Sequence, residues 1–198
     1  MGKLRHATFP VVNAVELVPY SPEWPGAFAA AAGALSEVLG TTALRIDHIG
    51  STSVPALMSK DRIDLQVGVA DLDDEPLLRE RLARVGFTLE EGKWADHVPS
   101  GWSQDPAEWE KRFAGGTSLG RPVNAHIRCV GRMNWRYALL FRDYLRADPM
   151  AAAAYAELKR RLAALAPSIA VYAEAKDPAC DLVMLGARRW AAATGWVP

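Results

Sequence analysis

The sequence has little cysteine, no net charge and no long apolar run. Its 198 residues include only Cys129 and Cys180, which lack metal-binding spacing, so we expect reduced thiols and a cytoplasmic protein. Lys+Arg and Asp+Glu are both 23, which gives no overall attraction to nucleic acid or anionic membranes. The Ala-rich segment 27–40 is too short to cross a bilayer, and residues 1–12 do not resemble a secretory signal.

What the chain does contain is typical of a folded domain. Half of its residues are hydrophobic and 23% are charged, which is enough apolar material for a core. We expect a loose tail over residues 1–14 and a single domain over 15–198. Within it, an α+β core is expected to about residue 130 and a helical part from about 131.

The periodicity of apolar residues changes along the chain. Alternation typical of strands occurs in 15–20, 43–50, 62–69 and 123–130. Helical spacing occurs in 21–40, 74–87, 134–149, 150–167 and 171–196. Residues 88–122, rich in Gly, Pro, Trp and charge, are expected to hold short strands and a long connection. Strands and helices do not strictly alternate, so we predict a mixed β-sheet with flanking helices and a C-terminal helical layer.

A short polar turn follows the strand-like segment 43–50. Gly50 allows close backbone approach, and the next three hydroxyl side chains could donate to a phosphate. These hydroxyls belong to Ser51, Thr52 and Ser53. A helical turn beginning at Val54 would add its amide groups. The alternative interpretation is an ordinary polar turn, because short Gly/Ser motifs are unspecific.

The next strand-like segment carries one carboxylate, Asp64. Gln66 lies two residues later and therefore shares its strand face. Two carboxylates at this spacing would bind Mg²⁺, whereas an amide is a weak ligand without charge. Asp47 is a further weak candidate for a metal ligand, and solvation at a strand end is its alternative role.

Three polar side chains share one face of segment 123–130. Asn124, His126 and Arg128 alternate there with apolar residues. This face is either exposed to solvent or lines a pocket that the C-terminal helices cover.

Arg142 falls on the apolar face of the predicted helix 134–149. A charge there needs a partner, which could be Asp143, Asp64 or a ligand phosphate. Lys60, Lys159 and Lys176 would each be solvated surface charges if taken alone.

Several of these motifs together resemble the GrpB family of bacterial proteins, also called UPF0157-type. They are "VELVPYSPEWPGAFAAAAGAL", "RIDHIGSTSVPAL", "IDLQVGV" and "VNAHIRCVGRMNWRYALLFRDYLRADP". The resemblance covers about residues 15–190 and implies a nucleotidyltransferase-like core. The same domain is found fused to dephospho-CoA kinase in some actinobacteria.

The resemblance also implies roles for individual residues. Gly50 and Ser51 match the triphosphate-binding turn of nucleotidyltransferases, and Asp64 matches the first metal-binding acid. Gln66 replaces the second acid. His126 or Arg128 stands about where a third would be expected. Two divalent ions need more carboxylates than Asp64 alone, so one Mg²⁺ is the expected cofactor.

Three functions follow as hypotheses. The first is an enzyme that binds a nucleotide or another phosphorylated small molecule and transfers a nucleotidyl or phosphoryl group. Its phosphates would be held by Gly50, Ser51, Thr52, Ser53, Lys60, Arg128, Arg142, Lys159 and Lys176. The second is a non-catalytic module that binds a ligand or partner and has lost the two-metal site. The third is a metabolic enzyme of different chemistry, with Asp64 and His126 as acid and base.

Overall fold

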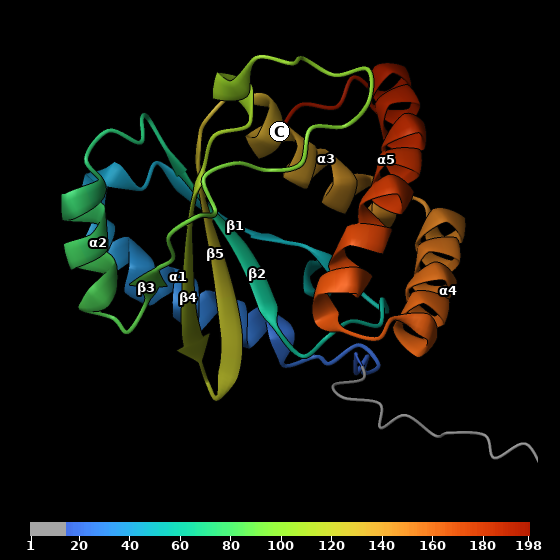
Figure 1. The fold of residues 1–198 in the computed structure, drawn as a ribbon, viewed down its shortest axis with the longest axis horizontal. Helices are drawn as coiled ribbons and strands as arrows, with labels where there is room; N and C mark the ends of the chain where they lie inside the picture. The colour runs from blue at the N-terminus through green and yellow to red at the C-terminus, as the bar shows by residue number, and fades with distance from the viewer. Residues whose placement is uncertain (1–14) are drawn as a thin grey trace, which may run out of the picture.

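Five strands form one mixed sheet in the computed structural model, which describes residues 15–198. They are β1 (Arg45–Ile49), β2 (Ile63–Val69), β3 (Thr88–Leu89), β4 (Arg112–Ser118) and β5 (Arg121–Cys129). Their order across the sheet is β1-β2-β5-β4-β3 (Figure 1). Strands β2 and β5 are parallel, and the other neighbouring pairs are antiparallel. The predicted mixed sheet is confirmed. The predicted tail over 1–14 lies outside the described residues.

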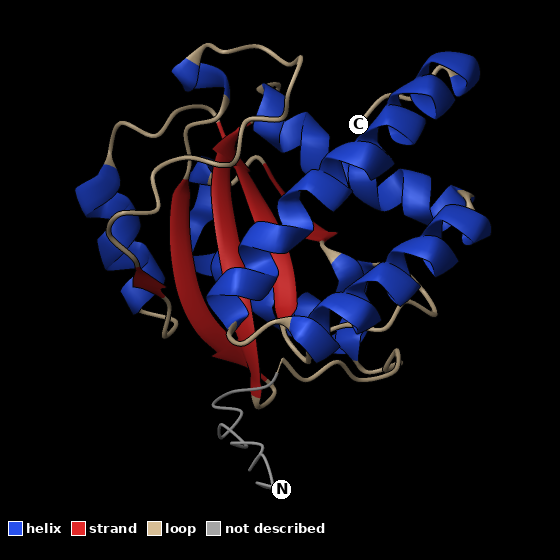
Figure 2. Cartoon of the chain, turned by 45° about the vertical axis from the view of Figure 1, so that its right-hand side comes forward, coloured by secondary structure: helices blue, strands red, loops and turns tan. Residues whose placement is uncertain are grey.

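Helices cover the sheet on both faces. They are α1 (Trp24–Leu39), α2 (Glu75–Ala83), α3 (Met133–Ala147), α4 (Pro149–Leu165) and α5 (Ile169–Thr194). Helices α1 and α2 lie on one side of the sheet, and α3, α4 and α5 gather on the other (Figures 1 and 2). The α+β class with a C-terminal helical layer is therefore confirmed. No helix among residues 15–198 is long and apolar enough to span a membrane.

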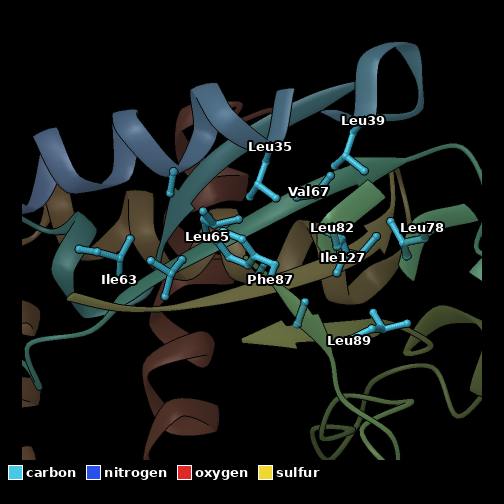
Figure 3. Packing of buried hydrophobic residues seen from close by; sticks show 14 of the residues in the cluster. Leu35, Leu39, Ile63, Leu65, Val67, Leu78, Leu82, Phe87, Leu89 and Ile127 are labelled. Carbon is cyan, nitrogen blue, oxygen red and sulfur yellow. The ribbon is translucent and has the colours of Figure 1, made fainter. Parts of the chain in front are cut away.

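The main core lies between the sheet and α1 and α2 (Figure 3). Leu65 of β2, Ile127 of β5 and Leu35 of α1 are all fully buried there. Alternation along β2 and β5 sends every second side chain into this core. Each such side chain contributes roughly 1.5–3 kcal/mol through burial.

Two predictions about the first elements are wrong. Residues 15–20 form no strand, because only Val18 pairs with another segment, at Ser59, and Pro19 has no amide hydrogen to extend the pairing. Helix α1 begins at Trp24, three residues after the start of the predicted helical segment 21–40. The Ser21 hydroxyl accepts a hydrogen bond from the Glu23 amide in the preceding turn.

The predicted boundaries of the C-terminal helices are close to those observed. Pro149 begins α4, where Asp148 accepts hydrogen bonds from the amides of Met150 and Ala151, both at 3.0 Å. Ser168 caps α5 through the amide of Val171. Helices α3 and α5 approach closely at Gly186, where a Cβ atom would lie 2.7 Å from the Tyr144 hydroxyl.

The long connection predicted within 88–122 joins β3 to β4. It runs over the end of the sheet as far as α5 (Figure 1), where His97 and Asp181 lie 2.9 Å apart. Trp109 anchors it, since its side chain is fully buried and its indole donates to the Ser103 carbonyl at 2.7 Å.

Candidate functional site

A cavity of about 490 Å³ lies between the polar face of the sheet and the C-terminal helices. We call it the site pocket. Six cationic residues line it, Lys60, Arg62, Lys111, Arg128, Lys159 and Lys176. Three carboxylates line it, Asp64, Asp96 and Asp177. Counting only lysine, arginine and aspartate, six positive and three negative charges make the lining cationic, although the whole chain carries no net charge.

The glycine turn lies directly against Asp64. Gly50 has φ +68°, and a Cβ atom at that position would lie 2.7 Å from Asp64 Oδ2. Glycine is therefore required both by the backbone conformation and by the space that Asp64 occupies. Gly50 and Ser51 both line the site pocket. The polar turn and the carboxylate thus form one continuous surface.

The predicted helical turn begins earlier than expected. Residues Ser51–Ser53 form a short 3₁₀ helix, and Val54 is extended. Thr52 and Ser53 are buried and do not line the site pocket, which corrects their predicted role as phosphate ligands. The physical reason is local bonding: the Ser53 hydroxyl donates to the Gly50 carbonyl at 2.6 Å, and Thr52 Oγ1 lies 3.0 Å from His48 Nε2.

Asp64 is held by polar groups of the parallel neighbour β5. The Asn124 amide donates to its Oδ1 at 2.7 Å, and His126 Nε2 lies 3.9 Å from the same oxygen. Burial acts to raise the pKa of Asp64. His126, Asn124 and the charge of Lys176 outweigh that effect, so the pKa lies below its usual value and the group is a carboxylate at neutral pH.

His126 is neutral at pH 7, because burial and the nearby charge of Arg128 lower its pKa. A guanidinium group of Arg128 lies 3.3 Å from His126 Nδ1 and can only donate. The proton of the neutral ring is therefore on Nε2, the nitrogen nearest Asp64. The predicted polar face of β5 does line a pocket, rather than being open to solvent.

Three lysines from three separate segments converge on the site pocket. Lys60 precedes β2, Lys159 lies on α4 and Lys176 on α5. None of the three forms an ion pair within 4 Å with a described carboxylate. Lys159 is 2% exposed and donates to the Met58 carbonyl, while Lys60 lies 5.6 Å from the ring of Tyr172.

Burial and mutual repulsion affect the charges of these lysines. Burial, followed by the charge of Lys176, lowers the pKa of Lys159 to about 7 and also lowers the pKa of Lys60. Burial opposes the charge of Lys176 too, but Cys180 and Asp64 outweigh it and raise its pKa. The result is a concentration of positive charge that an anionic ligand would stabilise.

Gln66 does not point into the site pocket. It is fully buried, accepts from Arg128 at 2.8 Å and donates to the Trp135 carbonyl at 3.2 Å. The predicted weak metal ligand is therefore a structural partner of Arg128. Its amide oxygen is turned toward Arg128 and away from the site pocket.

Arg128 is held by a carboxylate that the sequence interpretation missed. Asp96, from the connection between β3 and β4, accepts from Arg128 at 2.8 and 3.0 Å and from Lys111 at 2.5 Å. Burial acts to raise the pKa of Asp96, but the charges of Arg128 and Lys111 hold it well below its usual range. Arg128 lines the site pocket with its charge already neutralised.

Two more predicted site residues lie elsewhere. Arg142 is on α3, bonded to Asp143 at 2.7 Å and to the His48 carbonyl at 3.1 Å, and it does not line the site pocket. Asp47 lies on β1 and pairs with Arg45 at 2.6 Å. Asp47 is paired with Gln66 in the sheet register and therefore shares the sheet face of Asp64, but it does not line the site pocket.

The sequence interpretation also missed an aromatic wall. The rings of Tyr155 and Tyr172 line the site pocket beside the lysines, with the Cys180 thiol next to them. A sequence signal existed, since Tyr172, Lys176 and Cys180 are four residues apart, as are Tyr155 and Lys159, and such spacing puts side chains on one helix face.

The donor groups do not fit a two-metal centre. The described residues contain no cluster of three or more His, Cys, Asp or Glu side chains suited to a metal ion. Asp96 is occupied by Arg128 and Lys111, which leaves Asp64 beside the Gly50 turn and Asp177 on α5. One Mg²⁺ shared between Asp64 and ligand phosphates is compatible with this set, because Mg²⁺ commonly binds through one carboxylate plus phosphate and water oxygens.

Comparison with known proteins agrees with this architecture. The model of the GrpB protein family matches residues 14–185, so the chain belongs to the GrpB family. It is 35% identical over 149 residues to UPF0157 protein BH1888 of Halalkalibacterium halodurans, covering 75% of this chain and 69% of that protein. The predicted family membership is confirmed.

Longer relatives match this chain over part of their length. The chain is 38% identical over 197 residues to dephospho-CoA kinase of Mycolicibacterium paratuberculosis, covering 93% of this chain and 48% of that protein. It therefore spans about half the length of the first curated relatives it matches.

A solved structure of a GrpB protein supports the fold. The conserved protein GrpB from Enterococcus faecalis aligns with a TM-score of 0.71 and 31% identity over 88% of this chain and 99% of that chain. Cid1 poly(U) polymerase aligns over 71% of this chain and 42% of its own, with a TM-score of 0.46 and 16% identity.

Proposed function

We propose that this protein binds a nucleotide or another phosphorylated small molecule in the site pocket. The observation that carries the proposal is the convergence of Lys60, Lys159 and Lys176 without a paired carboxylate, next to the Gly50 turn. Like charges brought together in a partly buried pocket repel one another, and phosphate oxygens would reverse that cost. The buried rings of Tyr155 and Tyr172 supply an apolar wall for the rest of the ligand.

A single Mg²⁺ belongs to the proposal as a shared ion. Asp64 would hold it together with phosphate oxygens of the ligand, and the ion would neutralise charge on those phosphates. Gly50 permits the backbone to lie against Asp64, so the ligand phosphates and the carboxylate would meet at one place.

Transfer of a nucleotidyl or phosphoryl group is the finer form of this proposal. Asp64 favours it, because an ionised carboxylate lies beside the turn. The Gln66–Arg128–Asp96 network favours the alternative, a binding module that has lost the two-metal site. The neutral His126 beside Asp64 would suit acid–base chemistry on a metabolite. This third function becomes the leading hypothesis if nucleotides do not bind.

Calorimetric titration with ATP, GTP, CTP and pyrophosphate, with and without Mg²⁺, tests these alternatives. Lys176→Met should weaken binding about tenfold or more, because it removes a charged hydrogen-bond donor. Arg161→Met is the matched control. Arg161 lies on α4, two residues after Lys159, but its side chain is exposed and paired with Glu157. It should bind like the wild type.

Magnesium dependence then separates the two forms of the proposal. If Mg²⁺ strengthens binding and Asp64→Asn removes that effect, the transfer hypothesis gains support and product formation should be assayed. Binding that is indifferent to Mg²⁺ supports the non-catalytic module. Failure of the folded wild type to bind any of the four probes contradicts phosphate binding and favours acid–base chemistry instead.

A further inference from the structure

A second cavity, of about 480 Å³, lies between α3 and α5. We call it the aromatic cleft. Its walls include Trp102 from the long connection, Tyr137 from α3 and Trp196 from the segment after α5. Arg136 of α3 and Arg188 of α5 also line it. Among the described residues, Tyr137 alone lines both the aromatic cleft and the site pocket.

The walls of the aromatic cleft come from segments that are fixed in place. Trp196 donates its indole N–H to Asp143 at 3.1 Å and its backbone N–H to the Ala191 carbonyl at 3.1 Å. Gly195, with φ +68°, allows the chain to turn back toward α3. The rings of Trp102 and Tyr137 meet edge to face, 5.5 Å apart.

One side of the aromatic cleft is flat. On α5, Arg188, Ala191 and Ala192 lie at spacings of three and four residues and therefore share a face. The alanines leave room there that the neighbouring aromatic side chains do not fill. A flat apolar group could lie over the alanines between the aromatic rings.

The charges in the aromatic cleft are all positive. Neither Arg136 nor Arg188 forms a side-chain hydrogen bond or an ion pair with another described residue, and no described carboxylate lines the cavity. Arg188 instead lies over the ring of Trp102, 5.1 Å from its centroid. A guanidinium stacked in this way keeps its N–H edge free to bind a carboxylate or phosphate with two hydrogen bonds.

We infer that the aromatic cleft is a second ligand-binding site, for a small molecule with a flat aromatic body and one anionic group. The aromatic body would lie between Trp102 and Trp196, and the anionic group would bind Arg188 and Arg136. The inference does not depend on phosphate binding in the site pocket, because the two cavities have different charged residues.

Two matched probes test this inference by calorimetry on the full chain: 2-naphthoate and its uncharged counterpart 2-naphthamide. We expect the wild type to bind naphthoate about tenfold more tightly, because only naphthoate can form the charged hydrogen bonds. Arg188→Gln should abolish this preference while retaining the binding of naphthamide. Arg189→Gln is the matched control, because Arg189 is the next residue on α5 but does not line the cleft.

Three results would overturn the inference. They are equal binding of both probes by the wild type, a preference that survives both Arg188→Gln and Arg136→Gln, and a preference lost in Lys176→Met. The last result would assign the probe to the site pocket. If Arg188→Gln does not fold, as judged by circular dichroism, Arg136→Gln on α3 provides the same test independently.

Discussion

The two faces of the sheet come from the same strands but obey different physical rules. One face of β2 and β5 presents Leu65 and Ile127 to a dry core against α1 and α2. The opposite face presents Asp64, Asn124 and Arg128, whose polar groups are matched to one another or line the site pocket. Burial stabilises the first face without directional bonds, whereas the second needs each polar partner in the right place.

The difference between the two faces indicates which substitutions change the free energy of unfolding alone and which also change ligand binding in the site pocket. A change on the apolar face should alter the free energy of unfolding and leave the chemistry of the pocket intact. A change on the polar face should alter both, in proportion to the number of charged partners it leaves unmatched.

The largest expected effect is on the apolar face. Leu65→Ala should lower the free energy of unfolding by about 3 kcal/mol, because it removes fully buried methyl groups and leaves a cavity. Denaturant titration monitored by circular dichroism measures this. Ligand binding by the folded fraction should be unchanged. A loss below about 1 kcal/mol would mean that this face is not tightly packed.

The second effect is on the polar face. Asp96→Asn should lower the free energy of unfolding by about 2 kcal/mol, because Arg128 and Lys111 lose their shared carboxylate. The depressed pKa of Asp96 means that its contribution is present above about pH 4, the unfolded value, and is lost as the pH falls toward the folded value.

Denaturation curves between pH 7 and pH 3 test this sign. The wild type should lose stability more steeply below pH 4 than Asp96→Asn does. Parallel pH profiles of the two proteins would contradict the assignment of Asp96 as the partner of Arg128.

The third effect is at the Gly50 turn, which follows β1 and lies against Asp64 of the polar face. Gly50→Ala should lower the free energy of unfolding by about 1–2 kcal/mol, since φ is +68° and the new Cβ atom would contact Asp64. Gly33→Ala in α1 is the control: its Cβ atom has free space, and the change should stabilise by about 0.5–1 kcal/mol. The same sign for both variants would contradict the close approach at Asp64.

The smallest effect is on a lysine of the pocket. Lys159→Met should raise the free energy of unfolding by about 1 kcal/mol at pH 6, because it removes a charge that burial disfavours. The pKa of Lys159 is lowered to about 7, so its penalty is full below pH 7 and decreases as the pH rises toward the unfolded value.

Thermal unfolding at pH 6 and pH 9 measures this difference between Lys159→Met and the wild type. The stabilisation should shrink at pH 9, and binding of phosphate probes should weaken more at pH 6, where Lys159 is charged, than at pH 9. A variant that is less stable at pH 6 would show that the Lys159–Met58 hydrogen bond outweighs the cost of the buried charge.

Some elements were hidden in the sequence for an identifiable reason. Strand β4 contains Gly115 and Gly116, which lower strand propensity. The structure uses Gly116 for packing, because a Cβ atom there would lie 2.7 Å from the ring of Phe87. Asp96 was missed because it lies in an irregular connection without periodicity, and its partner Arg128 is 32 residues away.

The sequence by itself determined the class of fold, the two faces of β2 and β5, and the glycine turn before Asp64. These depend on local periodicity and backbone freedom, which neighbouring residues encode. Only the tertiary structure decided that Gln66 bonds Arg128, that Arg142 pairs with Asp143, and that the three pocket lysines converge. Those outcomes depend on how distant helices pack over the sheet, where the burial of each charge and the choice of its partner are set.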